Sequence, residues 1–102
     1  MTKEDLYKAI DEHIAKSGRQ YYREFYFGIT DDVERRLFSE HNVSKDKDNW
    51  IYGPADSVED AREIEKHYLD LGMQGYTGGG NENSLWVYCY LIRQHTKEGS
   101  ND

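Results

Sequence analysis

The chain has 102 residues, which suits one domain and excludes a multidomain enzyme or a repeat array. Aromatic residues make up 14% of it, which argues against intrinsic disorder although charged residues reach 32%. The formal net charge of −7 opposes nonspecific electrostatic binding to nucleic acid. The single cysteine, Cys89, excludes an internal disulfide, and the lack of a long apolar run predicts a cytoplasmic protein that does not cross a membrane.

Helices and strands alternate in the first half of the chain. Residues 3–17 are predicted to form a helix that ends at Gly18. The alternating aromatic segment 20–29 predicts a strand. One face of this strand carries the apolar core residues, and the other is a polar aromatic surface with Tyr26 and Gly28.

A second helix is predicted to begin near Thr30. With a rotation of about 100° per residue, Val33 and Leu37 point into the core. Arg36 then borders the buried side, whereas Arg35 points the opposite way. The helix therefore offers one guanidinium group to a site beside the core.

Three further elements complete the predicted fold. The short extended segment WIYG precedes a helix over about residues 58–71. A glycine-rich loop, residues 72–80, leads to the last strand, SLWVYCYLIR. This strand places Tyr88 and Tyr90 on one face and Cys89 on the other.

The order α-β-α-β-α-β predicts the α+β class. A small three-stranded, mainly antiparallel sheet flanked by helices accommodates these elements. The single domain is expected to span residues 1–95, and the polar residues 96–102 are expected to form a disordered tail.

One acidic side chain lies on the inward side of its helix. In the helix over residues 58–71, Glu65 falls inside the apolar arc, whereas most of its acidic neighbours lie on the solvated side. An inward carboxylate is costly to desolvate unless it is paired or bound to a cation. Two interpretations remain open: a salt bridge to an arginine such as Arg36 or an edge position that reaches water, and a metal ligand beside the tyrosine face of the first strand.

Tyr26, Arg36 and Glu65 together suit phosphodiester chemistry. A carboxylate binds a hard divalent cation. A guanidinium group stabilises the charge that develops at the phosphate, and a phenol orients or deprotonates the nucleophile.

The segment FYFGITDDVERRLFSEH resembles the second half of the GIY-YIG nuclease signature. Tyr26-Phe27-Gly28 stands for the YIG element, and Arg36, ten positions after Tyr26, stands for the catalytic arginine. AREIEKHYLD resembles the later helix whose glutamate binds the metal, and Glu65 is the match. The resemblance implies an endonuclease that hydrolyses DNA with a single Mg²⁺ or Mn²⁺ ion.

The chain departs from this family in two positions besides its acidic charge. No GIY strand precedes Tyr26 in the manner of a hairpin, so the C-terminal strand is expected to take its place in a permuted layout, with Tyr88 or Tyr90 as the missing tyrosine. The family often has a histidine four residues after the arginine, whereas His41 is five after Arg36. We therefore expect His41 at the helix C-cap, as an assistant in catalysis.

Several basic residues of the first half lie close in sequence, although acidic residues lie among them: Lys16, Arg19, Arg23, Arg35 and Arg36. Next to them, Tyr21 and Tyr22 could stack on nucleic-acid bases, although strand tyrosines more often pack.

Two other functions stay open from the sequence. An inactive interaction module or DNA-mimic inhibitor on the same scaffold would use its acidic surface to bind a basic protein partner. A homodimeric structural protein would pair through its aromatic strand edge.

Overall fold

The computed structural model describes residues 1–76 and 81–98. The elements follow one another in this order: α1 (Lys3–Ser17), η1 (Tyr22–Glu24), β1 (Phe25–Thr30), η2 (Glu34–Glu40), β2 (Trp50–Pro54), α2 (Val58–Leu71), β3 (Gln74–Gly75) and β4 (Trp86–Leu91). Within the described ranges, no helix combines the length and the hydrophobicity needed to span a bilayer.

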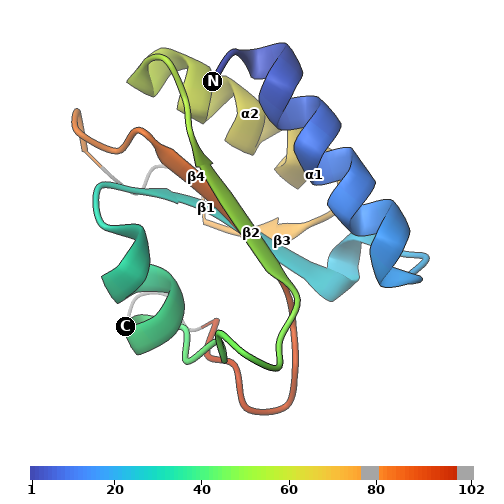
Figure 1. The fold of residues 1–102 in the computed structure, drawn as a ribbon. Helices are drawn as coiled ribbons and strands as arrows, with labels where there is room; N and C mark the ends of the chain where they lie inside the picture. Colours follow the sequence, from blue (N-terminus) through green and yellow to red (C-terminus); the bar gives the residue numbers. More distant parts are fainter. Residues whose placement is uncertain (77–80, 99–102) are drawn as a thin grey trace.

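The four strands form one sheet in the spatial order β2-β4-β1-β3 (Figure 1). β4 lies between β1 and β2 and runs antiparallel to both, whereas β3 runs parallel to β1. The predicted α+β class is therefore confirmed, but the sheet is mixed and has a fourth strand. β3 was missed because two residues are too few to show a periodic pattern.

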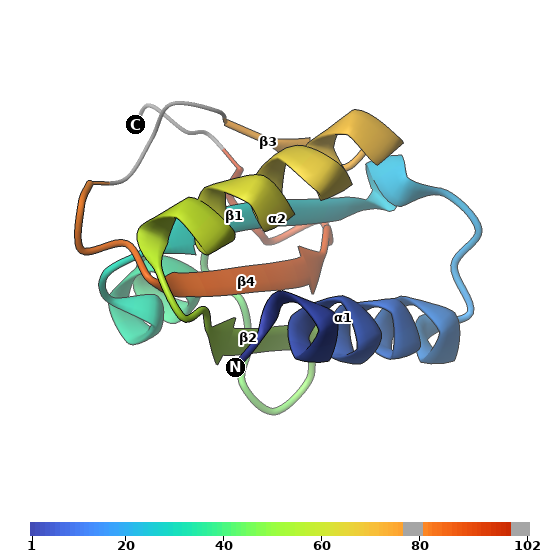
Figure 2. The ribbon, with the colours of Figure 1, turned by 90° about the horizontal axis from the view of Figure 1, so that it is seen from above.

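Helices α1 and α2 cover one face of the sheet (Figure 2). The core beneath them is almost entirely apolar, because alternate residues of β1 and β4 point toward the helices. Fully burying each such large side chain contributes about 1.5–3 kcal/mol. The strand residues of this core are Phe25, Phe27 and Ile29 with Val87, Cys89 and Leu91.

The helix termini follow the predicted capping chemistry. The Thr2 side chain accepts a hydrogen bond from the Asp5 amide, and the Asp5 carboxylate accepts one from the Thr2 amide. Gly18 ends α1 with a φ of 76°, a left-handed conformation that glycine adopts without strain.

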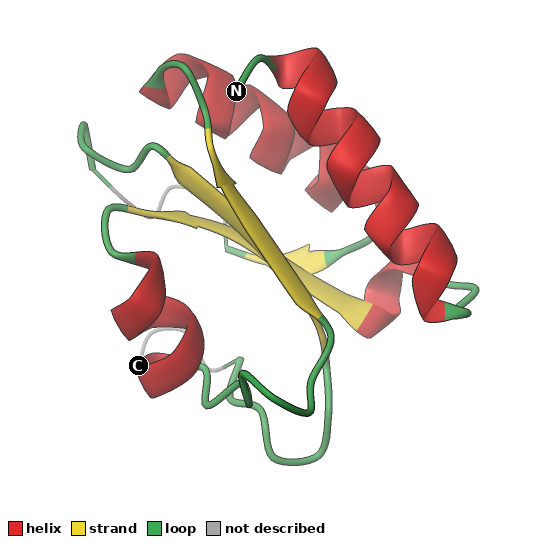
Figure 3. Cartoon of the chain, in the orientation of Figure 1, coloured by secondary structure: helices red, strands yellow, loops and turns green. Residues whose placement is uncertain are grey.

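The other face of the sheet is covered by η2 and by the segment that follows β4, as Figure 3 shows for η2. All six residues of β1 are buried, so the polar aromatic face predicted to be a surface is a second core. The strand also begins later than predicted, because Tyr22–Glu24 form a 3₁₀ turn. This second core contains three tyrosines, Tyr26, Tyr88 and Tyr90.

The packed domain extends past residue 95, where the disordered tail was predicted to follow. The Lys97 amide donates a hydrogen bond to the His41 carbonyl at 2.8 Å, and Thr96 is buried. Residues 96–98 thus contact the rest of the domain through Thr96 and the Lys97 backbone, whereas 99–102 lie outside the described residues. The centre of the predicted glycine-rich loop, residues 77–80, also lies outside them.

Candidate active site

A pocket of about 340 Å³ is lined mainly by residues of β1, η2 and α2. Four of the predicted site residues line it: Tyr26, Arg36, Glu65 and Tyr88. They come from four different elements, β1, η2, α2 and β4. The fold therefore gathers in one cavity side chains that are far apart in the sequence.

The pairing of β1 with β4 brings the tyrosines together. In the antiparallel register Tyr26 lies opposite Tyr90, and Gly28 lies opposite Tyr88. The Tyr26 ring stacks on that of Tyr90 with centroids 5.3 Å apart. The expected adjacency of the C-terminal strand and the Tyr26 strand is thus confirmed.

Gly28 makes room for the Tyr88 ring. A Cβ atom at Gly28 would lie 2.4 Å from the Tyr88 hydroxyl oxygen, far inside van der Waals contact. The phenol therefore lies directly over the β1 backbone, a place that any side chain at Gly28 would occupy. This close approach explains the glycine in an otherwise aromatic strand.

The hydroxyl group of Tyr88 lies between an imidazole and a guanidinium group. His41 Nδ1 is 2.6 Å from the Lys97 carbonyl oxygen, which only accepts hydrogen bonds, so Nδ1 carries the proton. Nε2 of the neutral ring therefore accepts a hydrogen bond from the Tyr88 hydroxyl at 2.8 Å. Arg36 Nε donates to the same hydroxyl oxygen at 3.3 Å.

Burial sets the protonation of both groups. His41 is only 2% exposed, and burial lowers the pKa of its imidazole, which favours the neutral form that accepts a proton. Burial also raises the pKa of Tyr88, so the phenol is protonated at neutral pH. The charge of Arg36 acts in the opposite direction and favours the phenolate.

A wide helical turn brings Arg36 and His41 to the same hydroxyl group. In an α-helix two residues five apart would point about 140° away from each other. The segment Glu34–Glu40 is a π-helix, and the His41 amide donates to the Arg36 carbonyl at 2.9 Å across this turn. His41 is the C-cap residue, as predicted, but the π-turn directs its ring to Tyr88. Such turns are frequent at functional sites.

The same turn corrects the prediction for Arg35. Arg35 does not point away from the site, because it lines the pocket together with Arg36. Glu40 bridges the two arginines, with one carboxylate oxygen 2.6 Å from Arg36 Nη1 and the other 3.0 Å from Arg35 Nε. The hydrogen bond from Arg36 lowers the pKa of Glu40, which is therefore ionised.

Glu65 is turned inward, as its position on the helix predicted. Its side chain is 4% exposed, and burial raises the pKa of its carboxyl group to about 7. Arg36 pairs with Glu40 and not with Glu65, so the salt bridge expected with Arg36 is not formed, and it is the charge of Arg62 that lowers the pKa of Glu65 against the effect of burial. β3 pairs with β1 at Tyr26 and Phe27, and the Glu65 side chain lines the pocket.

The donor chemistry of the pocket fits one hard divalent cation held by one carboxylate. A carboxylate buried in a pocket, such as that of Glu65, is the oxygen ligand that Mg²⁺ or Mn²⁺ prefers. Within the same residues no group of three or more His, Cys, Asp or Glu side chains is placed to hold a metal ion. Mg²⁺ commonly binds in this way, through one or two carboxylates, waters and substrate phosphate.

Tyr90 and His41 lie behind the pocket rather than in its wall. The Tyr90 hydroxyl donates to Glu98 at 2.9 Å and lies 3.0 Å from His41 Nδ1. Of the two tyrosines considered for the missing position, Tyr88 is therefore the one that lines the cavity.

Polar residues near the glycine-rich loop also line the pocket, and sequence reasoning missed them. The Asn81 amide group donates to Asp31 at 3.4 Å, and the Asn81 backbone amide donates to Ser84 at 2.9 Å. All three line the cavity, as does Tyr76. For Tyr76, Asn81 and Ser84, which lie in or just after the glycine-rich segment, that segment was the available signal, because such loops allow close approach to a site.

Comparisons of this chain with protein-family models, curated proteins and solved structures give no match.

Proposed function

We propose that the protein is a divalent-metal-dependent endonuclease of the GIY-YIG type that hydrolyses DNA phosphodiester bonds. One observation carries the proposal: the Tyr88 hydroxyl lies between Arg36 and His41 in a pocket that also contains the buried carboxylate of Glu65. A phenol, a cation, a proton acceptor and an acidic ligand are the groups that this hydrolysis requires.

The Tyr88–His41 pair supports a proton-transfer role. Neutral His41 Nε2 already accepts the hydrogen bond of the Tyr88 hydroxyl. When Tyr88 takes a proton from an attacking water, its own proton passes to His41 Nε2, so no buried phenolate has to persist. Arg36 Nε, at 3.3 Å from the phenol oxygen, stabilises negative charge there during the transfer.

Arg36 and Arg35 support phosphate binding. Their guanidinium groups line the pocket and are held by Glu40, so both are oriented before a substrate arrives. Arg36 then contacts both the phenol and the phosphate, which places the attacking water beside the phosphorus atom. Arg35 adds a second positive charge on the same side.

Glu65 supports binding of the metal ion. A divalent cation on this carboxylate would supply positive charge that polarises the phosphate and stabilises the leaving group. Ala61, Ile64 and Tyr68 of the same helix are buried and hold the Glu65 backbone against the core, so the position of its carboxylate is fixed by α2.

The test compares two glutamates of α2. Purified wild-type protein is expected to nick supercoiled plasmid DNA in Mg²⁺ or Mn²⁺. Glu65→Gln is expected to slow nicking by about 100- to 1000-fold, the usual effect of removing one such stabilising group. Glu63→Gln is the matched control, because Glu63 is exposed and pairs with Lys3 at 2.9 Å.

The control should cleave within a few-fold of wild type. Calorimetric titration should show Mn²⁺ binding that Glu65→Gln abolishes and Glu63→Gln retains. Nicking that survives Glu65→Gln would contradict the proposal. A wild-type protein that nicks no DNA and binds a basic protein instead would favour the acidic interaction module.

A further inference from the structure

A second surface of the molecule combines exposed aromatic side chains with basic ones. It lies where α1 leads into β1, and it is defined by Tyr21, Tyr22, Arg23 and Leu71. Tyr21 is 52% exposed and Leu71 is 42% exposed. Tyr21 lines two hollows of about 260 and 230 Å³. Apolar side chains exposed in such a cluster are typical of a binding surface.

The charge of this surface differs from that of the whole protein. The Arg23 guanidinium lies 4.3 Å from the centre of the Tyr21 ring. In the described part of the chain, neither Arg23 nor Lys16 is within ion-pair distance of a carboxylate, whereas Arg19 pairs with Glu24 at 3.6 Å. In a protein of net charge −7, this surface therefore offers cations that are not neutralised by a partner.

Separate hollows lie between this surface and the active site, lined by successive residues of the chain. The hollow beside Tyr21 reaches Gly72, the next one is lined by residues 73–76, and Tyr76 also lines the catalytic pocket. β3, which these residues include, lies at the edge of the sheet beside β1 (Figure 2). Tyr76 is 57% exposed and is a second aromatic ring between the surface and the site. Glu98 is an acidic residue there.

The distance from the surface to the site corresponds to a few nucleotides. The Gln74 side chain donates to the Arg23 carbonyl at 3.0 Å, and Gln74 is paired with Tyr26, so the surface and the site are tied to the same strand. At about 3.3 Å per residue, Arg23 and Gly28 are at most about 17 Å apart. About five stacked nucleotides span that distance.

We propose that the Tyr21–Arg23 surface and the β3 edge bind an unpaired stretch of the DNA strand that enters the active site. This inference rests on the proposed nuclease function and names its substrate class, DNA with a single-stranded portion. Unpaired bases expose a face on which Tyr21 and Tyr76 stack, while Arg23 contacts the phosphates. Paired bases of a duplex are already stacked on each other and leave no such face to the tyrosines.

The experiment measures binding without cleavage. Fluorescence anisotropy of a fluorescein-labelled oligothymidylate of about 15 nucleotides is followed with the Glu65→Gln protein as parent. Adding Tyr21→Ala is expected to weaken binding by about 5- to 100-fold, as for loss of one base-stacking ring. Tyr21→Phe keeps the ring and should bind like the parent.

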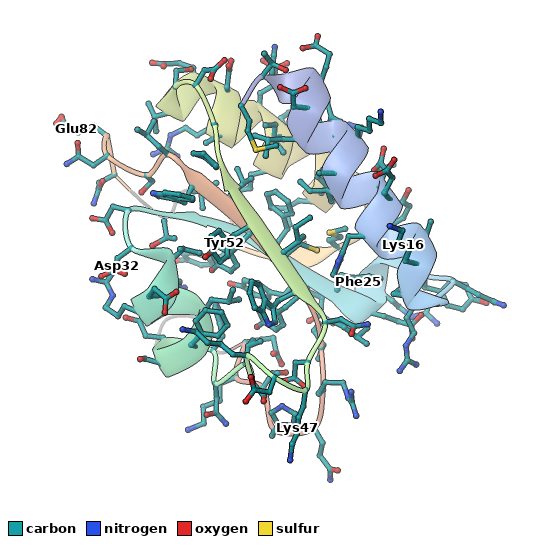
Figure 4. The ribbon with its side chains drawn as sticks, in the orientation of Figure 1. Lys16, Phe25, Asp32, Lys47, Tyr52 and Glu82 are labelled. Carbon is teal, nitrogen blue, oxygen red and sulfur yellow. The ribbon has the colours of Figure 1, made fainter. Side chains whose placement is uncertain are left out.

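Arg23 and a distant lysine separate phosphate contact from general charge. Arg23→Gln is expected to reduce the slope of log K against log salt concentration by about 0.7, the value for one phosphate contact on a single strand. Lys47→Gln removes an exposed cation from the loop before β2, and it should leave affinity and slope unchanged. Figure 4 labels Lys47, and Lys16 beside the α1 end of the proposed surface.

The outcomes are distinct for the two proposals. Three results would each overturn this inference. The parent does not bind the oligothymidylate, the Tyr21→Ala variant binds it as tightly as the parent does, or the parent binds a duplex of the same length more tightly. If wild-type protein cleaves no DNA but Tyr21-dependent binding is found, the binding surface stands and the nuclease proposal fails. If plasmid nicking depends on Glu65 but binding of the oligothymidylate does not depend on Tyr21, the nuclease proposal stands and this inference fails.

Discussion

The two faces of the central strands bury similar numbers of side chains but differ in their chemistry, because one face is apolar and the other carries hydroxyl groups. Toward α1 and α2, β1 and β4 present Phe27, Val87 and similar residues in an apolar core. Toward η2 the same strands present Tyr26, Tyr88 and Tyr90, whose environment includes His41 and Arg36. Because strand residues alternate between faces, one pair of strands separates the part of the molecule that supplies stability from the part that carries polar chemistry.

The tyrosine face needs hydrogen-bond partners that the apolar face does not need. A buried hydroxyl needs a hydrogen-bond partner, and Tyr88 and Tyr90 obtain theirs from η2 and from the segment after β4. The apolar face needs only shape complementarity. Substitutions on the two faces should therefore affect different properties.

The largest effect on stability is expected from Phe27→Ala on the helix face. Phe27 is fully buried and stacks on Tyr68 with ring centroids 5.1 Å apart. Removing the ring should lower the free energy of unfolding by about 3–5 kcal/mol. Urea denaturation measures this loss of free energy. Where the variant stays folded, its rate of plasmid nicking should stay near that of wild type. A loss of activity without a loss of stability would break the separation of the two faces.

The next effect concerns Glu65, which extends from the helix face into the pocket. Its folded-state pKa of about 7 exceeds the ordinary value of 4.5. Between these two values the folded state keeps a proton that the unfolded state releases. The contribution of Glu65 to the free energy of unfolding is therefore fully present below pH 4.5 and is lost as the pH rises through 7. The loss is on the order of 3 kcal/mol.

Urea denaturation of metal-free protein at pH 5 and pH 8 checks this dependence. Glu65→Gln should reduce the difference between the two values, and Mn²⁺ should restore stability to the wild type at pH 8 because it binds the ionised carboxylate. If Glu65→Gln leaves the pH dependence unchanged, the carboxyl group does not carry it.

A smaller loss of stability but a large loss of activity is expected from Gly28→Ala. The added methyl group would collide with the Tyr88 hydroxyl and displace the ring from His41 and Arg36. Overpacking costs about 1–3 kcal/mol, and loss of the positioned phenol should slow nicking by about 100-fold or more. Ile10→Val is the matched control in the apolar core under α1, away from the pocket, with a stability cost of about 0.5–1.5 kcal/mol and no effect on rate.

The smallest effect is expected from Tyr90→Phe. Tyr90 lies behind the pocket, and its hydroxyl contacts Glu98 and His41. Removing it should cost about 1 kcal/mol of unfolding free energy and change nicking only a few-fold, whereas Tyr88→Phe should slow nicking far more. Equal losses of activity for the two variants would show that the pocket does not distinguish the tyrosines.

Local patterns in the sequence predicted much of this arrangement. Alternation along FYFGIT and WVYCYL assigned the faces of β1 and β4, and the helical arc of α2 singled out Glu65. The π-turn before His41, the two-residue β3 and the packing of residues 96–98 were not predicted. These features depend on contacts between distant segments, such as His41 with Lys97, which no local periodicity encodes.

The burial of β1 on both faces was missed for the same reason. From the sequence alone, Tyr26 and Gly28 form a polar strand face that looks exposed. Only the packing of η2 and the segment after β4 converts that face into a core with a pocket.

The place of β4 in the sheet has a consequence for how the protein matures. β4 is the last strand along the chain, yet it lies at the centre, between β1 and β2. During synthesis the two earlier strands have no partner between them until residues 86–91 leave the ribosome. Assembly of the pocket must wait for this final insertion, so a stalled nascent chain would lack both the central strand of its sheet and the Tyr88 phenol.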